Sequence, residues 1–178
     1  GLEGLLGTPE TLQVEGYVSY LLLDHEQNML WYTRWDQPYL EGLDLDTSTL
    51  AHSIELPGHG WQLLQRERQL FVSMVTDSGL WTVDLDTGMQ SGVIDLPDPV
   101  SSLCDTGDEL VGALSASDQI VRIDPDNNTE PEFYPAASDL IDDDGKPLRN
   151  SNVNAVVCDP YSGRIYASRG ADNLIAVM

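Results

Sequence analysis

The chain has 178 residues, of which 30 are acidic and 8 are Lys or Arg, so its formal net charge is −22. This excess of negative charge argues against nucleic acid and anionic membranes, because both are bound through basic side chains. Hydrophobic residues make up 41%, so the acidity does not indicate disorder, and the chain can bury a core. No apolar run approaches the length of a membrane span.

The composition also bears on the compartment. The chain begins Gly1-Leu2-Glu3-Gly4, without an initiator Met or a secretory leader, so we expect either a removed signal peptide or a trimmed chain. Lys146 is the only lysine, and Asp outnumbers Glu by 20 to 10. Such a surface is typical of secreted, periplasmic and salt-adapted proteins. We expect an extracytoplasmic protein, with a halophilic cytoplasm as the alternative.

An internal repeat is the strongest signal. Similar segments end at Asp46, Asp86 and Asp124, which are 40 and 38 residues apart. Between them, short apolar runs alternate with Asp, Gly, Pro, Ser and Asn, as in strands joined by turns, and no long stretch has helical periodicity. A period of about 40 residues with four strands is typical of a β-propeller blade.

The sequence therefore predicts an all-β fold, a β-propeller of about four four-stranded blades in a single domain, 1–178. The predicted blades are 18–58, 60–98, 100–135 and 152–178, with an insertion at 136–152. The last blade lacks a strand, which residues 10–16 could supply to close the ring, because closure removes exposed sheet edges. Two alternatives remain: half of a larger ring completed by a second copy, or a fragment of a longer propeller.

The fourth repeat carries a family resemblance. It reads Asn154-Ala155-Val156-Val157-Cys158-Asp159-Pro160-Tyr161-Ser162-Gly163-Arg164-Ile165-Tyr166-Ala167-Ser168. An inner strand followed by Asp-Pro-x-x-Gly and a second strand resembles the blades of YVTN-type and quinoprotein-amine-dehydrogenase-like propellers. The resemblance implies the architecture and says little about activity, because such propellers serve as binders, enzyme subunits and hydrolases.

One face of the predicted propeller collects ligand-binding candidates. The loops between outer and inner strands, and those between second and third strands, lie on the same face. They contain Arg34, Trp35, His59, Arg149, Asn152 and Arg169. The arginines could bind a carboxylate or phosphate, or simply pair with the abundant aspartates, and Trp35 could stack on a sugar or aromatic ring.

Two further features concern metal and sulfur. The insertion contains Asp142 and Asp144 beside a glycine, a run that could bind calcium or could be a solvated acidic loop. Cys104 and Cys158 occupy matching positions in successive blades, so we expect them to point the same way and to be buried free thiols rather than a disulfide.

The absence of a coherent catalytic motif favours a secreted or periplasmic binding or assembly module without its own catalytic centre. Its partner would be a protein or a small anionic or sugar ligand, and it could form a homo-oligomer. Whether it is an enzyme stays open. One alternative is a metal-dependent lactonase-type hydrolase, with oxygens from Asp77, Asp118, Asn152 and Asn154; another is a subunit of a larger oxidoreductase.

Overall fold

The computed structural model describes residues 11–114, 116–127, 129–135, 153–169 and 174–178, which form strands and turns and no helix. Three sheets have four antiparallel strands in sequence order and the fourth has three. The first two sheets consist of β1 (Val18–Asp24), β2 (Met29–Arg34), β3 (Tyr39–Asp44), β4 (Thr49–Glu55), β5 (Gly60–Arg66), β6 (Gln69–Met74), β7 (Leu80–Asp84) and β8 (Met89–Ile94). The others consist of β9 (Val100–Asp105), β10 (Leu110–Leu114), β11 (Gln119–Ile123), β12 (Glu132–Pro135), β13 (Val153–Cys158), β14 (Ile165–Arg169) and β15 (Leu174–Val177).

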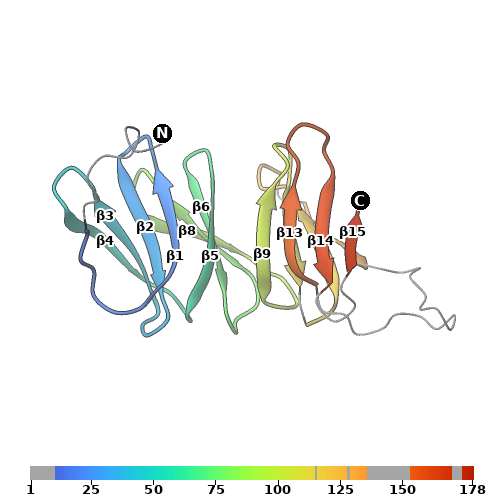
Figure 1. The fold of residues 1–178 in the computed structure, drawn as a ribbon, viewed down its shortest axis with the longest axis horizontal. Coiled ribbons are helices and arrows are strands. Elements are labelled where there is room, and N and C mark those ends of the chain that lie inside the picture. Colours follow the sequence, from blue (N-terminus) through green and yellow to red (C-terminus); the bar gives the residue numbers. More distant parts are fainter. Residues whose placement is uncertain (1–10, 115, 128, 136–152, 170–173) are drawn as a thin grey trace, which may run out of the picture.

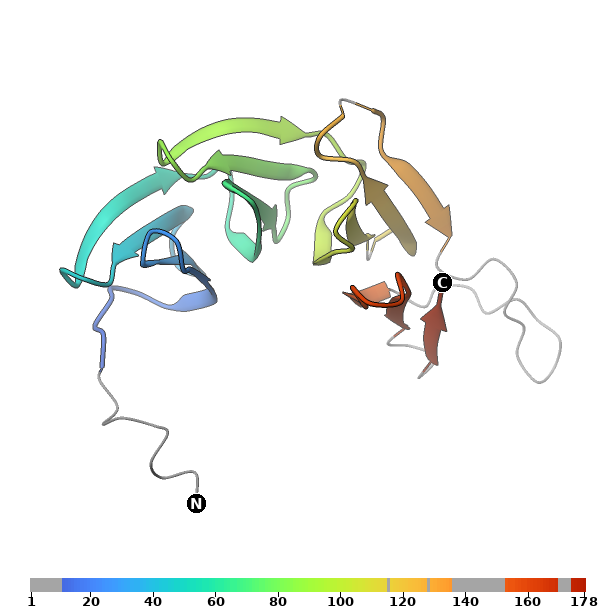
Figure 2. The ribbon, with the colours of Figure 1, turned by 90° about the horizontal axis from the view of Figure 1, so that it is seen from above.

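The four sheets stand side by side like the blades of a fan (Figure 1). Seen from above, they follow an open arc, with the first and fourth sheets at its two ends (Figure 2). We call these sheets blades one to four. The strands of each sheet fall within one of the predicted repeats, and the predicted all-β architecture is confirmed.

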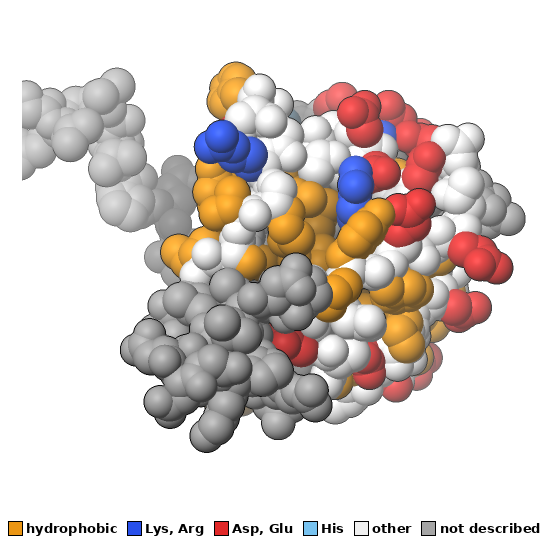
Figure 3. Space-filling model, turned by 90° about the vertical axis from the view of Figure 1, so that its right-hand side faces the viewer, with side chains coloured by type: hydrophobic (Ala, Val, Ile, Leu, Met, Phe, Trp, Pro, Cys, Tyr) orange, Lys and Arg blue, Asp and Glu red, His pale blue; other side chains and the backbone are white. Residues whose placement is uncertain are grey.

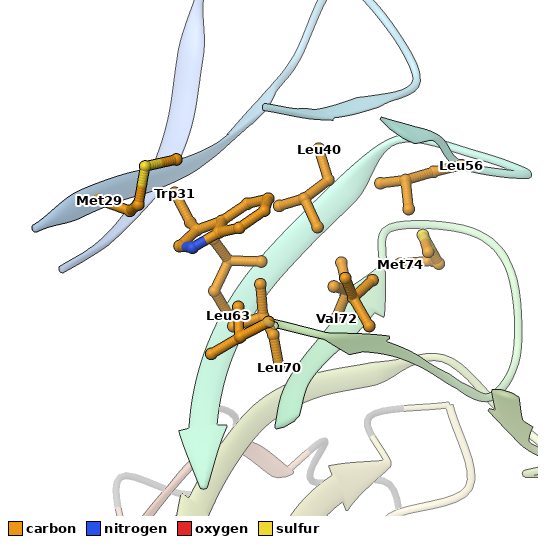
Figure 4. Packing of buried hydrophobic residues seen from close by; sticks show 10 residues of the cluster. Met29, Trp31, Leu40, Leu56, Leu63, Leu70, Val72 and Met74 are labelled. Atoms are coloured by element: carbon orange, nitrogen blue, oxygen red, sulfur yellow. The ribbon is translucent and has the colours of Figure 1, made fainter. Parts of the chain in front are cut away.

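Neighbouring blades pack face to face through apolar side chains. Because side chains alternate along a strand, each strand sends every second residue to the same neighbour. Between the first two blades, Trp31 of β2 lies among Leu63 of β5 and Leu70 and Val72 of β6, all of them buried (Figure 4). Two similar cores lie between the second and third blades and between the third and fourth. The arc is therefore held by three sheet-to-sheet cores.

The repeated acidic landmarks form the turns between third and outer strands. The Oδ1 atoms of Asp44, Asp84 and Asp124 each accept hydrogen bonds from the backbone N–H groups two and three residues further on. Asp and Asn favour such turns because the carboxylate replaces a backbone acceptor. The residues that occupy the same place in successive blades are thus Asp44, Asp84 and Asp124, rather than Asp46, Asp86 and Asp124. They are evenly spaced, 40 residues apart.

A buried ion pair joins the first two blades. Asp24, whose side chain is 0% exposed, ends β1 and lies 3.1 Å from Arg68 Nη1 in the second blade. The backbone N–H groups of Glu26 and Gln27 also donate to Asp24 Oδ1. Burial raises the pKa of the Asp24 carboxyl, but the hydrogen bonds from Arg68 and the two amides and the charge of Arg68 outweigh this effect, so its pKa is lowered.

We therefore expect Asp24→Asn to reduce the free energy of unfolding by about 1.5–3 kcal/mol near neutral pH, the range for hydrogen bonds to charged groups. Because the folded-state pKa is lowered from 3.8, the wild-type advantage is present above that value and is lost as the pH falls through the folded-state pKa. Urea unfolding of both proteins across the acidic range measures it. A difference that stays constant with pH would contradict this assignment.

The expected closure of the ring by residues 10–16 is not formed. Residues 11–16 contain no strand, and β15 has β14 as its neighbour in the fourth sheet. The chain is instead fixed to the first blade, since Tyr17 N donates to Asp36 Oδ1 and Tyr17 O accepts from Trp35 N. Gly16 has φ +79° beside Arg34, where any Cβ would collide with the guanidinium. These contacts lead the N-terminal segment over its own blade rather than toward the fourth.

A disulfide between Cys104 of β9 and Cys158 of β13 joins the third and fourth blades, with Cα atoms 5.6 Å apart. The expectation of free thiols that point the same way was wrong. The ladders give the reason: Cys104 pairs with Val111, whereas Cys158 pairs with Ile165. Both partners belong to the core between these two blades.

The two cysteines are therefore not equivalent, although each precedes an Asp in the sequence. In the third blade, the last ladder pair is formed by Asp105 with Leu110, and in the fourth it is formed by Cys158 with Ile165. Cys158 thus occupies the place of Asp105. A slip of one residue reverses the face to which a side chain points, so Cys158 faces back toward the third blade.

The disulfide predicts a redox-dependent stability. Because it closes a loop over a sequence separation of 54, reduction should lower the free energy of unfolding by about 2–4 kcal/mol. Urea unfolding with and without dithiothreitol measures this loss. The double variant Cys104→Ala/Cys158→Ala is the control, and its free energy of unfolding should be the same with and without dithiothreitol. Equal stability of the oxidised and reduced wild type would contradict the bond.

Among the described residues, we find no helix that has both the length and the apolar character needed to cross a membrane.

Candidate functional site

A hollow of about 320 Å³ lies on the face where ligand-binding loops were predicted. Residues from all four blades line it, since it gathers the ends of second strands and the beginnings of inner strands. The lining residues are Trp35, Trp61, Met74, Val75, Pro99, Val100, Ser101 and Asn154. Six of these eight side chains are apolar, so the hollow is suited to an apolar group.

Two tryptophans form one wall of the hollow. Trp35 follows β2 and is 48% exposed, and Trp61 lies near the start of β5 and is 37% exposed. Their ring centroids are 5.4 Å apart with an angle of 61° between the planes, an edge-to-face arrangement. Trp61 Nε1 donates to Ser101 O across the boundary between the second and third blades. This bond fixes Trp61, while Trp35 presents a large apolar surface to solvent.

Arg34 directly precedes Trp35 in the sequence, and its side chain is engaged by two carboxylates. Its Nη2 lies 2.9 Å from Asp36 Oδ2, and its Nη1 lies 3.6 Å from Glu41 Oε2. Hydrogen bonds from the Arg34 side chain and then from the Tyr17 amide lower the pKa of Asp36 to about 2. Burial, followed by the hydrogen bond to Glu41, raises the pKa of Tyr32 to about 12. Of the two roles predicted for Arg34, ligand binding and pairing with acidic side chains, the structure therefore shows the second.

Of the other predicted ligand residues, the structure describes His59 with its side chain and Arg169 by its backbone alone. His59 is partly buried in the loop before β5, and its Nδ1 has no partner among the described residues. Asn154, considered as a metal ligand, lies exposed in the hollow. The backbone of Arg169 ends β14 and pairs with Val153, but its side chain is not described. Arg149 and Asn152 lie outside the described residues, so their roles stay predictions.

The structure also leaves the predicted calcium site untested. Asp142 and Asp144 lie outside the described residues. Within the described ranges, no group of three or more His, Cys, Asp or Glu side chains could hold a metal ion. Asp77, another predicted oxygen donor, accepts a hydrogen bond from Thr76 Oγ1.

Comparison with known proteins identifies the architecture. No family model matches the sequence, and no curated protein does. The chain is similar to the computationally designed Ika4 protein, with a TM-score of 0.71 and 14% identity over 96% of this chain and 98% of that one. It is also similar to the WD40 β-propeller domain of Doa1, with a TM-score of 0.71 and 12% identity over 93% of this chain and 52% of that one. The fold is that of a β-propeller or of part of one.

The computationally designed Ika8 protein is another structural neighbour, with a TM-score of 0.68 and 13% identity over 90% of this chain and 45% of that one. The propeller arc thus spans about half the length of the Ika8 and Doa1 chains it matches. These likenesses concern the fold alone. The resemblance to YVTN-type propellers stays a prediction.

Sequence reasoning found Trp35 and missed the rest of the wall. Trp61 and Met74 have the sequence context of ordinary strand residues, and their convergence depends on how the four blades pack. One signal was present, because Trp61 directly follows Gly60 at the start of an inner strand, beside the loop that contains His59. A bulky aromatic at that edge points to the same mouth as the loop.

The two tryptophans should differ in their contribution to stability. Trp61→Phe keeps an aromatic ring but loses the bond from Nε1 to Ser101 O, so we expect the free energy of unfolding to fall by about 0.5–1.5 kcal/mol. Trp35→Phe is the matched control, since no hydrogen bond from Trp35 Nε1 is found in the described part of the chain, and should change it by less than about 0.5 kcal/mol. Urea unfolding of both variants tests this order, and a larger loss for Trp35→Phe would contradict it.

Proposed function

We propose that this protein is a binding module without its own catalytic centre, which recognises a protein partner through the hollow beside Trp35 and Trp61. The observation that carries the proposal is the exposed tryptophan pair, at 5.4 Å, in a hollow lined by all four blades. Exposed tryptophans that form a concave apolar surface are typical of the centre of a binding interface, where aromatic side chains contribute most of the affinity.

The chemistry of the lining favours a peptide segment over the other predicted ligands. A sugar needs several hydrogen-bonding partners, but only Ser101 and Asn154 offer polar side chains here, and Ser101 Oγ already donates to Ala113 O. An anionic ligand would need a free cation, and Arg34, the one predicted ligand arginine whose side chain the structure describes, is engaged by Asp36 and Glu41. We therefore expect a peptide with an aromatic or aliphatic side chain.

The net charge adds a second element of specificity. A protein with a formal charge of −22 attracts positively charged partners and repels acidic ones. We expect the apolar residue of the partner to be flanked by Lys or Arg. The affinity should then fall as the salt concentration rises, because salt screens this attraction.

We also propose that the protein works in an extracytoplasmic, oxidising compartment. The disulfide between Cys104 and Cys158 supports this proposal, because such bonds persist in secreted and periplasmic proteins and are rare in a reducing cytoplasm. The described residues contain no comparable observation in favour of a lactonase-type hydrolase or an oxidoreductase subunit.

A peptide selection tests the binding proposal. A phage-displayed library of random peptides selected on the immobilised protein should yield sequences with an aromatic or aliphatic residue next to Lys or Arg. Titration of a selected peptide should change the tryptophan fluorescence, and Trp35→Ala should weaken its binding by about 30-fold or more. Tyr161→Ala is the control, since Tyr161 is an exposed aromatic in the turn between β13 and β14, away from the hollow. If no peptide is selected, or if Trp35→Ala binds equally well, the proposal is wrong.

A further inference from the structure

The first blade has an apolar face that none of the three cores covers. Its ladders align Leu23, Leu30, Leu43 and Leu50 in one row across β1 to β4. The next row consists of Leu21, Tyr32, Glu41 and Ser53, so it is apolar on β1 and β2 and polar on β3 and β4. These side chains point away from the core that contains Trp31, because neighbouring residues of a strand face opposite sides. We call this surface, made of Leu21, Leu23, Leu30, Tyr32, Leu43 and Leu50, the first end face.

The fourth blade has a matching apolar face at the other end of the arc. Val157, Tyr166 and Val177 align in one row across β13, β14 and β15, and the neighbouring row ends at Ile175. None of these four side chains is charged. They lie opposite Ile165, which belongs to the core with the third blade. We call the surface of Val157, Tyr166, Ile175 and Val177 the second end face.

The residue pattern of β15 is that of a strand with both faces covered. In β15, Ile175, Ala176 and Val177 follow one another, and Ala176 packs against the core between the third and fourth blades. A sheet with one solvated face shows alternation of apolar and polar residues, whereas a sheet covered on both sides shows continuous apolar runs. The second end face therefore has the composition of an interface.

Both end faces are nevertheless partly open in the single chain, although Tyr32 and Leu43 of the first are buried. Leu21 is 55% exposed and Ile175 is 69% exposed. Figure 2 shows why, because the first and fourth blades stand at opposite ends of the arc with its open side between them. Figure 3 views the molecule from the side of the fourth blade, where hydrophobic side chains gather in the middle of the view. The three cores hold the two faces too far apart to meet each other.

We propose that the two end faces dock a second copy of this chain, so that two arcs close into one ring. The fourth blade of each copy packs on the first blade of the other. This arrangement repeats the sheet-to-sheet packing of the three existing cores, and it covers both faces at once. The chain's match to 52% of the WD40 propeller domain of Doa1 agrees with an arc that is half of a ring.

Closure by the chain's own N-terminal segment fits the structure less well. Tyr17 is bound to Trp35 and Asp36 of the first blade. Gln13 and Glu15 line a hollow together with Tyr32 and Leu50, on the first end face itself. This segment therefore lies at the wrong end of the arc to cover Ile175 or Val177, and a second copy can reach both end faces.

The charge of the chain opposes this association and makes it depend on the salt concentration. Two copies, each with a formal charge of −22, repel each other, and salt screens this repulsion while it leaves apolar packing intact. The dimer should therefore become tighter as the salt concentration rises. This dependence is opposite to that expected for the binding of a basic peptide, so failure of the ring leaves the binding proposal standing.

The test is the molar mass of the 178-residue chain, measured by light scattering after size-exclusion chromatography at several concentrations and salt levels. We expect twice 19.6 kDa. Leu21→Asp and Ile175→Asp should each weaken the dimer by about 100-fold or more, because each places a charge in an apolar interface twice. Met89→Asp is the matched control, as Met89 is 68% exposed at the start of β8, off both end faces, and should leave the dimer intact.

A mixing experiment checks the head-to-tail arrangement. A heterodimer of Leu21→Asp and Ile175→Asp contains one damaged and one intact contact, whereas each variant alone has two damaged contacts. Mixing the two variants should therefore restore part of the dimer. A wild-type mass of 19.6 kDa at every concentration and salt level overturns the proposal, and so does a dimer that either end-face variant leaves unchanged.

Discussion

Face-to-face packing of apolar sheets is the interaction on which this structure depends. Trp31, Phe71 and Val111 each belong to a different one of the three cores, and each core joins two consecutive blades. Because the blades contain no helix in the described ranges to cover them, each sheet must bury its faces against another sheet. This requirement fixes the order of the blades, brings their loops to one mouth, and leaves one apolar face without a neighbour at each end of the arc.

The sequence was sufficient for the blades and insufficient for their assembly. Strand lengths and turns follow from local chemistry, as the carboxylates of Asp44, Asp84 and Asp124 show, so the repeat predicted them well. The bond between Cys104 and Cys158 depends on a one-residue difference in the ladders, which an alignment of the two Cys-Asp pairs conceals. The open arc depends on the angle between neighbouring sheets. The repeat period gives the number of residues in a blade and does not determine this angle.

For the candidate site too, the sequence predicted what depends on a single blade and missed what depends on the assembly of several blades. Sorting loops by their position in a blade placed Trp35 at the mouth, because that step requires only topology. Trp61 and Met74 were missed because they join the hollow only when the blades are assembled. For Arg34, the sequence left ligand binding and pairing with Asp open, and the structure shows contacts to both Asp36 and Glu41. Composition alone could not decide this, since it depends on which carboxylates come within reach.

The bond between Cys104 and Cys158 has a consequence for how the molecule comes apart. In an array of packed repeats, the end unit has one neighbour and opens first, so the three-stranded fourth blade is the weakest unit. A covalent link from its inner strand to the third blade keeps it tethered when its other contacts open. It therefore recloses as an intramolecular event, and a protease has less time to act on the strands from β13 to β15.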